Sequence, residues 1–307
     1  MQKAPPTPKG FRDILPEVAK KRRETIRKIE DVLLEFDFVP LETPTLEFAE
    51  TLTGKYGEEE KLIYKFKDRG DRDLALRYDL TVPLARFIAN NQTLLKPTFS
   101  RYQIGQVFRG ENPQHGRWRE FTQFDFDTVG FGKGTGDQAA KEDAKIIATA
   151  IKAARAAGLD NAVMTINHRA SFSDIPIEAT RVFDKWHKIG SEGVKKELSD
   201  LGLSDKFEEF KTKLELGKKN SALANIIGAL RDLEMTEDKD FSFDWTLARG
   251  LDYYTGVIFE LKPDNNLESL SIGAGGRYDN LIGMFAGKQI PAVGFSFGID
   301  RIVDILQ

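Results

Sequence analysis

Residues 100–130 read SRYQIGQVFRGENPQHGRWREFTQFDFDTVG. Side chains of two kinds alternate along each half of this stretch, and successive side chains of a β-strand point to opposite faces of a sheet. A polar turn from Gly110 to Gly116, which includes Pro113, separates the two halves. The stretch therefore predicts a long hairpin of two strands.

The hairpin predicts a charged face. The period of two puts Gln123 and Asp127 on the same face of the second strand, and pairing of the two strands can set Arg109 against them. Arg117 and Arg119 follow the turn. Arginines beside a carboxylate suit a ligand that carries both phosphate and ammonium groups. A surface hairpin with solvated charges fits this stretch equally well, so the rest of the chain must decide between the two interpretations.

Composition narrows the classes of protein. The chain has 307 residues, 40% of them hydrophobic and 30% charged, with a net charge of −3. This length suffices for a sizeable core and more than one domain. The acidic balance gives no overall field for nucleic acid, so such a partner needs a local basic patch. No apolar run approaches the roughly 18 residues of a membrane span. The N-terminus lacks the apolar core of a signal peptide, so we expect a cytoplasmic protein with no membrane partner.

The sequence offers little for metal or thiol chemistry. It contains no cysteine and three histidines, which show no spacing typical of metal ligands. Disulfides, thiolate zinc sites and cysteine nucleophiles are therefore excluded, and we expect no metal site built from protein side chains.

The chain before the hairpin predicts mixed structure. Apolar spacing predicts a helix over residues 17–36, and the two prolines in residues 38–47 suit an edge strand or an interface. Residues 62–66 and 74–78 predict a second hairpin. Asp79 then precedes a predicted helix over residues 81–90. Its carboxylate can cap this helix or bind an ammonium group, and the residue type favours the cap.

The chain after the hairpin predicts a helical segment between strands. Residues 130–136 contain four glycines but lack the GxxxxGK[ST] spacing, so they predict a flexible turn. A helix over 137–157 and a strand over 163–166 precede a helical stretch rich in lysine and glutamate, residues 169–237. Its lysines can meet RNA phosphates, although a solvated helix face explains any one of them. Strands return at 241–245, 257–261 and 292–298.

Two glycine-rich strands complete the pattern. Residues 273–276 read GAGG, where the missing side chains let a ligand lie against the backbone. A tight turn without a ligand is the alternative. The strand over 292–298 carries small residues on one face and runs into a helix with Arg301 in its first turn.

Taken in order, these stretches resemble the three signature motifs of class II aminoacyl-tRNA synthetases: an extended segment with prolines, an arginine hairpin and a glycine-rich strand that runs into a helix. LARGLDYYTG at 247–256 and GAGGRYDNL at 273–281 resemble two signatures peculiar to histidyl-tRNA synthetases. RYDLTVPLAR at 77–86 and PKGFRDILP at 8–16 are also similar to that family. The resemblance covers nearly the whole chain.

The resemblance implies an α+β fold, with an antiparallel sheet flanked by helices and a helical insertion domain. It divides the chain into a first catalytic part (1–168), the insertion (169–240) and a second catalytic part (241–307). It also implies a homodimer formed through residues 38–47 and an insertion that approaches the acceptor arm of tRNA(His). The family continues into a C-terminal anticodon-binding domain, which these 307 residues do not contain. A catalytic fragment and a naturally short paralogue are both compatible with this ending.

The implied activity is the activation of histidine with ATP to histidyl-adenylate, followed by transfer to tRNA(His). The histidine carboxylate attacks the α-phosphate itself, so catalysis requires alignment and positive charge rather than a protein nucleophile. Mg²⁺ is expected with ATP, and its ligands are not assigned. One alternative is the regulatory subunit of ATP phosphoribosyltransferase, a histidine-binding paralogue that also lacks the anticodon domain; another is an inactive interaction domain. An interaction domain has no physical need for the whole set of site residues, and their joint presence favours the enzyme.

The resemblance implies a role for five residues in ATP binding. Arg109 and Arg249 match the catalytic arginines at the α-phosphate. Arg117 matches a residue near the γ-phosphate, Glu111 one near the adenine, and Arg301 the arginine at the adenine ring.

It also implies a histidine site around the α-ammonium group and the imidazole. Its members are Asp79, Gln123, Asp127, Arg249, Tyr253, Tyr254 and Tyr278. Some family members have glutamate where Asp79 and Asp127 stand, and glutamate is also frequent at the position of Asp300. Asp125 shares the face of Gln123 and Asp127, but the resemblance gives it no role.

Overall fold

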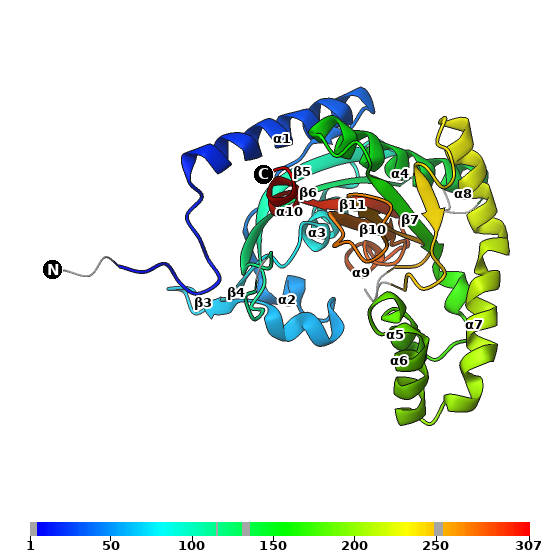
Figure 1. Ribbon diagram of the computed structural model, residues 1–307. Coiled ribbons are helices and arrows are strands. Elements are labelled where there is room, and N and C mark those ends of the chain that lie inside the picture. Colours follow the sequence, from blue (N-terminus) through cyan, green and yellow to red (C-terminus); the bar gives the residue numbers. More distant parts are fainter. Residues whose placement is uncertain (1–4, 115, 131–135, 249–253) are drawn as a thin grey trace.

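The computed structural model describes residues 5–114, 116–130, 136–248 and 254–307 (Figure 1). An eight-stranded sheet with flanking helices forms the centre of the molecule, as the α+β prediction requires. The strands lie in the order β1 (Val39–Pro40), β5 (Phe99–Phe108), β6 (Glu120–Val129), β11 (Ala292–Gly298), β10 (Gly273–Arg277), β9 (Val257–Lys262), β7 (Val163–His168) and β8 (Phe241–Phe243).

The predicted hairpin is the pair β5–β6. Its register sets Gly105 opposite Gln123 and Arg101 opposite Asp127. On its other side β6 pairs with β11, so the polar residues of β6 lie inside the sheet rather than at an edge. Neighbouring strands are antiparallel from β5 to β7, and only the two edge pairs among the described strands are parallel.

Helices cover one face of the sheet and form the main core with it (Figure 1). These helices are α1 (Pro16–Glu35), α4 (Asp137–Ala157), α8 (Ser221–Asp232) and α10 (Ile299–Ile305). Phe124 and Phe126 of β6 point into this core. Because side chains alternate along a strand, Gln123, Asp125 and Asp127 face the opposite side of the sheet.

The opposite face carries a second, smaller core. Its elements are α3 (Thr81–Asn91), α9 (Gly283–Ala286), α2 (Ala49–Leu52), the 3-10 helix η1 (Gly57–Leu62) and a small sheet ordered β2 (Leu46–Phe48), β4 (Asp73–Leu76) and β3 (Lys65–Lys67). The predicted hairpin over 62–78 corresponds to β3–β4, which pair antiparallel.

Residues 169–219 form a helical layer with a core of its own. It contains η2 (Arg169–Phe172), α5 (Ile177–Phe183), α6 (Trp186–Asp200), η3 (Ser204–Lys206), α7 (Phe207–Glu215) and η4 (Leu216–Lys219). Figure 1 shows α5, α6 and α7 projecting from one end of the sheet, whereas α8 lies beside α4. Leu223, Ile226 and Leu230 of α8 accordingly belong to the main core.

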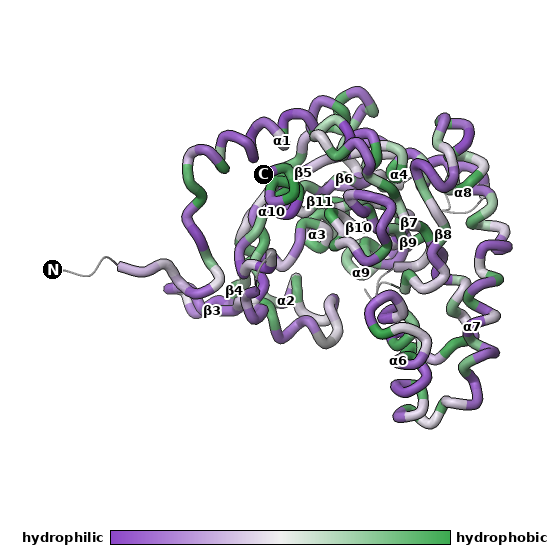
Figure 2. Tube along the Cα trace, viewed as in Figure 1, coloured by the Kyte–Doolittle hydropathy of each residue, from purple (hydrophilic) through white to green (hydrophobic). Residues whose placement is uncertain are grey.

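The distribution of hydropathy agrees with this layering. Figure 2 shows hydrophilic residues over much of α1, with hydrophobic residues interspersed along it. Ile29 and Leu33 are the fully buried apolar residues of α1, one helical turn apart on the face toward the sheet. No helix within the described residues is long and apolar enough to cross a membrane.

Candidate active site

A cavity of about 360 Å³ opens on the face of the sheet opposite α1 and α4. The neighbouring strands β6, β11 and the glycine-rich β10 line it, together with Arg109 and the hairpin turn after β5 and with Tyr78, Asp79 and Thr81. It contains all the predicted site residues that the structure describes: Asp79, Arg109, Glu111, Arg117, Gln123, Asp127, Tyr254, Tyr278 and Arg301. Arg249 and Tyr253 lie outside the described residues.

Asp127 lies at the inner end of the cavity with both carboxylate oxygens engaged. Arg101 approaches its Oδ2 at 2.7 Å, and the Tyr278 hydroxyl donates a hydrogen bond to its Oδ1. Burial raises the pKa of Asp127, while the Arg101 guanidinium opposes the shift. A side chain at Gly294 would collide with this carboxylate, so β11 requires glycine there. The three side chains form one preassembled buried unit.

The motif-based assignment did not include Arg101. The side chain of Arg101 is completely buried, and it lies across the hairpin from Asp127. The alternation of the strand puts Arg101 on the same face as Arg109, so the sequence pattern could have included it among the site residues. The register that sets it opposite Asp127 was not available from the sequence.

Asp125 occupies the same face as Gln123 and Asp127 and is 2% exposed. Within the described part of the chain, its Oδ1 and the Oε1 of Gln123 have no hydrogen-bond partner. Burial raises the pKa of Asp125 to about 7; the Arg101 guanidinium lowers it and the Asp127 carboxylate raises it. Two unpaired acceptors in a buried cavity suit an incoming cationic group. Asp125 is therefore a candidate site residue that the sequence left without a role.

Asp79 serves as a helix-start carboxylate. Its Oδ1 accepts hydrogen bonds from the backbone N–H groups of Thr81 and Val82 at 3.1 and 3.0 Å, at the first turn of α3. The Tyr56 hydroxyl donates to the same oxygen at 3.1 Å. Burial raises the pKa of Asp79, and these hydrogen bonds oppose the shift. These hydrogen bonds confirm the favoured cap interpretation, and Asp79 also lines the cavity.

Arg109 lines the cavity and is held by two aromatic rings. Its guanidinium lies 4.3 Å from the ring centre of Tyr78 and 5.0 Å from that of Phe121. Its Nε donates to the carbonyl oxygen of Tyr78 at 3.2 Å. Contact with aromatic faces orients a guanidinium while it remains charged. Arg109 therefore offers a fixed positive charge to a ligand in the cavity.

Arg117 and Glu111 lie at the outer end of the cavity, beside the hairpin turn. Arg117 Nε and Glu111 Oε2 are 2.7 Å apart, and the Arg117 side chain is 53% exposed. This pair differs from the inner unit, because the Arg117 side chain is largely in contact with solvent, although that of Glu111 is only 17% exposed. An incoming phosphate can compete for Arg117 at modest cost.

The helix after β11 is tied to the hairpin through Asp300. Its Oδ2 accepts a hydrogen bond from the Thr122 N–H at 2.8 Å, and its other oxygen forms ion pairs with Arg12 and Arg22. The neighbouring Arg301 lines the cavity and donates from Nη1 to the Ser271 carbonyl at 2.8 Å. Aspartate at this position thus keeps the connection between the last helix, the hairpin and the N-terminal segment.

The glycines of β10 have a packing role in addition to lining the cavity. A Cβ at Gly276 would lie 2.7 Å from the Val257 carbonyl oxygen and 2.8 Å from the ring of Tyr254. Tyr254 could not keep its place beside this strand if residue 276 were larger. In the described part of the chain, no three histidine, aspartate or glutamate side chains are arranged to hold a metal ion.

The antiparallel sheet, the arginine hairpin on its open face and the last strand running into a helix with Arg301 define a class II aminoacyl-tRNA synthetase fold. A family model described as "Histidyl-tRNA synthetase" matches residues 10–302. The chain belongs to the histidyl-tRNA synthetase family, as its motifs predicted.

Curated relatives agree with the family. The chain is 42% identical to a protein of Aeropyrum pernix named "Histidine--tRNA ligase", over 98% of this chain and 74% of that protein. It is 38% identical to the protein of the same name from Helicobacter pylori strain P12, over 98% of this chain and 75% of the relative.

Solved structures agree as well. The histidyl-tRNA synthetase of Nostoc sp. PCC 7120 superposes with a TM-score of 0.82 at 30% identity, covering 99% of this chain and 76% of the other. A Bacillus halodurans protein described as an ATP phosphoribosyltransferase regulatory subunit/histidyl-tRNA synthetase superposes with a TM-score of 0.80 at 26% identity, covering 100% and 84%.

Proposed function

We propose that this chain is a histidine–tRNA ligase: it joins histidine to ATP as histidyl-adenylate, releases pyrophosphate and passes the histidyl group to tRNA(His). The observation that carries the proposal is that one cavity brings buried unpaired acceptors together with Arg109, Arg117 and Arg301. Such a cavity suits a cationic amino acid and a triphosphate bound end to end. The 42% identity to a histidine–tRNA ligase supports the same activity.

Histidine binds at the inner end in this proposal. Asp125 Oδ1 and Gln123 Oε1 accept hydrogen bonds from its α-ammonium group, with Asp79 nearby, because these oxygens would otherwise stay buried and unpaired. The imidazole lies against Tyr254 and Tyr278. Asp127 acts on the imidazole through Tyr278, whose hydroxyl it orients. Arg249 and Tyr253 complete this set on the strength of the sequence motif alone.

ATP binds toward the mouth, as its magnesium complex, with the α-phosphate at Arg109 and Arg249. Glu111 and Arg301 lie near the adenine and Arg117 near the γ-phosphate. A carboxylate oxygen of histidine forms a bond to the α-phosphorus, and the bond from that phosphorus to the bridging oxygen of pyrophosphate breaks. Fixed positive charge beside the phosphorus lowers the barrier to this step. The terminal ribose of the tRNA then attacks the histidyl carbonyl, and AMP leaves.

We further propose a homodimer and a role for the helical segment in binding RNA. Val39, Leu46, Phe48 and Phe66 are large exposed hydrophobic residues of β1 and the small sheet, and a second copy of the chain can cover them. Residues 169–240 act as an insertion between catalytic parts 1–168 and 241–307, and its lysines meet the phosphates of the acceptor arm. The chain works in the cytoplasm.

The decisive experiment is histidine-dependent exchange of labelled pyrophosphate into ATP by the purified chain. Exchange with histidine, and none with other amino acids, is the expected result. The description of the B. halodurans protein keeps the regulatory subunit as the second candidate. A folded chain that binds histidine but catalyses no exchange would favour that candidate and contradict the ligase.

A further inference from the structure

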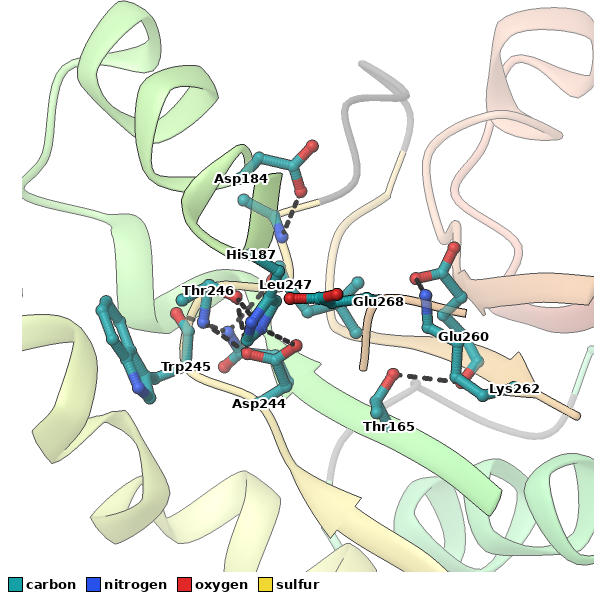
Figure 3. Close-up of polar contacts among 12 residues, drawn as sticks. Thr165, Asp184, His187, Asp244, Trp245, Thr246, Leu247, Glu260, Lys262 and Glu268 are labelled. Carbon is teal, nitrogen blue, oxygen red and sulfur yellow. Dashed lines mark hydrogen bonds and ion pairs between the residues drawn. The ribbon is translucent and has the colours of Figure 1, made fainter. Parts of the chain in front are cut away.

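A second polar cluster lies outside the cavity, where the helical segment meets residues 244–248. These five residues follow β8 and lead directly to Arg249. Figure 3 shows Asp184 and His187 of the helical segment close to Asp244 and Thr246. We call this cluster the insertion junction: Asp184, Trp186 and His187 on the helical side, and Asp244, Trp245, Thr246 and Ala248 on the strand side.

The first contact of the junction is a hydrogen-bonded triangle. His187 Nε2 lies 3.1 Å from Asp244 Oδ2 and 3.0 Å from Thr246 Oγ1. The Thr246 hydroxyl donates to Asp244 Oδ1 at 2.6 Å, so its oxygen faces His187 as an acceptor. Both neighbours of Nε2 are therefore acceptors, and Nε2 carries the hydrogen. The hydrogen bond to Asp244 raises the pKa of His187.

The second contact reaches the backbone next to Arg249. Asp184, at the end of α5, accepts a hydrogen bond from the N–H of Ala248 at 3.0 Å. Ala248 is 5% exposed and is packed in the core of the helical segment. The rings of Trp186 and Trp245 meet edge to face, with centres 4.8 Å apart. The helical segment thus holds the chain up to one peptide bond before Arg249.

The catalytic sheet holds the same segment from the other side. Asn167 of β7 donates from Nδ2 to the carbonyl oxygens of Trp245 and Leu247 at 3.3 and 3.0 Å. The N–H of Asp244 donates to the carbonyl of Ile166 at 3.1 Å. Residues 244–248 therefore form a connection whose backbone position depends jointly on the sheet and on α5 and α6.

We infer that Asp184 and His187 are positioning residues for adenylate formation, because they fix the backbone that leads into Arg249. The inference rests on the proposed function, in which Arg249 contacts the α-phosphate. A misplacement of about 1 Å at a reacting group can cost on the order of a hundredfold in rate. Side chains that touch no substrate can therefore influence the chemical step strongly. Neither residue lines the cavity, so neither is expected to contribute directly to binding.

The test compares four variants by histidine-dependent pyrophosphate exchange, with kcat and KM measured separately, and by thermal unfolding. Asp184→Ala and His187→Ala remove the two contacts, and His187→Gln keeps an N–H that can reach Asp244. Glu192→Ala is the control, because Glu192 lies on the same helix, is 87% exposed and pairs with Lys195. We expect kcat to fall about tenfold in the two alanine variants with KM nearly unchanged, and near-normal kcat in His187→Gln and the control.

The outcomes separate the inference from the proposed function. Alanine variants whose kcat stays within about twofold of the control overturn the inference while the ligase activity stands. The inference is also overturned if His187→Gln does not recover the kcat lost in His187→Ala and if kcat follows thermal stability in all variants. That pattern indicates that the two side chains contribute packing alone. No exchange by the unmodified chain overturns the proposed function and the inference together.

Discussion

The two ends of the cavity present charge in opposite ways. At the inner end, Arg101 and Asp127 pair at 2.7 Å with no exposure of Arg101, and Tyr278 completes the unit. At the mouth, Arg117 and Glu111 pair at the same distance, but Arg117 is 53% exposed. The two pairs have equal distances but different interaction energies, because burial removes the water that would otherwise stabilise each charge.

The difference suggests a division of labour. A buried pair cannot exchange partners cheaply, so the inner end keeps one shape before and after the amino acid binds. A pair whose cationic partner is solvent-exposed dissociates at low cost, on the order of 1 kcal/mol, so Arg117 can move from Glu111 to a triphosphate. We therefore expect a rigid inner end, which recognises the small amino acid, and an adaptable mouth, which admits the flexible triphosphate. The variants below test this expectation.

The largest effect is expected from Arg101→Met. Removing the guanidinium leaves the buried carboxylate of Asp127 without its counter-charge, which typically costs about 3–5 kcal/mol. The free energy of unfolding, measured with denaturant, should fall by that amount. The double variant Arg101→Met/Asp127→Asn should recover part of the loss, because it removes the uncompensated charge as well. A single variant as stable as the unmodified chain would mean that Arg101 does not stabilise the inner end.

Arg109→Ala should mainly affect the chemical step. Arg109 is fixed between two aromatic rings and offers its charge to the α-phosphate in the proposed mechanism. Losing one preorganised stabilising group costs about 2–4 kcal/mol of transition-state stabilisation. The kcat of pyrophosphate exchange should fall accordingly, while calorimetry should still detect histidine binding at the inner end. Unchanged exchange would remove Arg109 from the mechanism.

Asp125→Asn tests whether the inner end recognises the ammonium group. A hydrogen bond to a charged partner contributes about 1.5–3 kcal/mol, so the Kd for histidine should rise roughly 10- to 100-fold. Since the pKa of Asp125 is about 7, the affinity of the unmodified chain should increase as pH rises through that value and the carboxylate ionises. The variant should lack this component, and subtracting its pH profile removes the titration of histidine itself.

The ionisation of Asp125 that should strengthen histidine binding should lower the free energy of unfolding of the ligand-free chain. The folded pKa of Asp125, about 7, lies above the unfolded value of about 3.9. Its contribution to the free energy of unfolding is therefore fully present below pH about 4 and is lost as pH rises through about 7. Asp125→Asn should become more stable relative to the unmodified chain over this range. A stability difference that does not change with pH would contradict a buried, titrating Asp125.

Periodicity and motifs predicted much of this molecule. The hairpin over 100–130, the helix over 137–157 and the strand over 292–298 agree with β5–β6, α4 and β11. The alternation of β6 was sufficient to put Gln123, Asp125 and Asp127 on one face, because a strand's period leaves no other choice. Motifs separated by more than 200 residues were also brought to one cavity, as the family resemblance implied.

What could not be predicted depended on partners distant in sequence. The importance of Arg101 depends on the hairpin register, and the burial of Asp125 depends on a third strand, β11, which pairs with β6 on its other side. The sequence predicted a helical stretch over 169–237, but not that α8 within it packs on the main core. The strand expected over 241–245 ends at Phe243, because Asp244 turns the chain by bonding the N–H of Thr246.

Arg117→Ala should produce the smallest effect and provides the direct counterpart of Arg101→Met. Arg117 is the exposed partner of its ion pair with Glu111, so the free energy of unfolding should change by less than about 1 kcal/mol. If Arg117 nevertheless meets the γ-phosphate, the KM for ATP should rise several-fold, and increasing salt should weaken ATP binding more in the unmodified chain than in the variant. The KM for histidine should not change, because the inner end keeps its buried pair. A loss of stability comparable with that of Arg101→Met would show that the two ends do not differ in the way their exposures indicate, and the proposed division between a rigid and an adaptable end would fail.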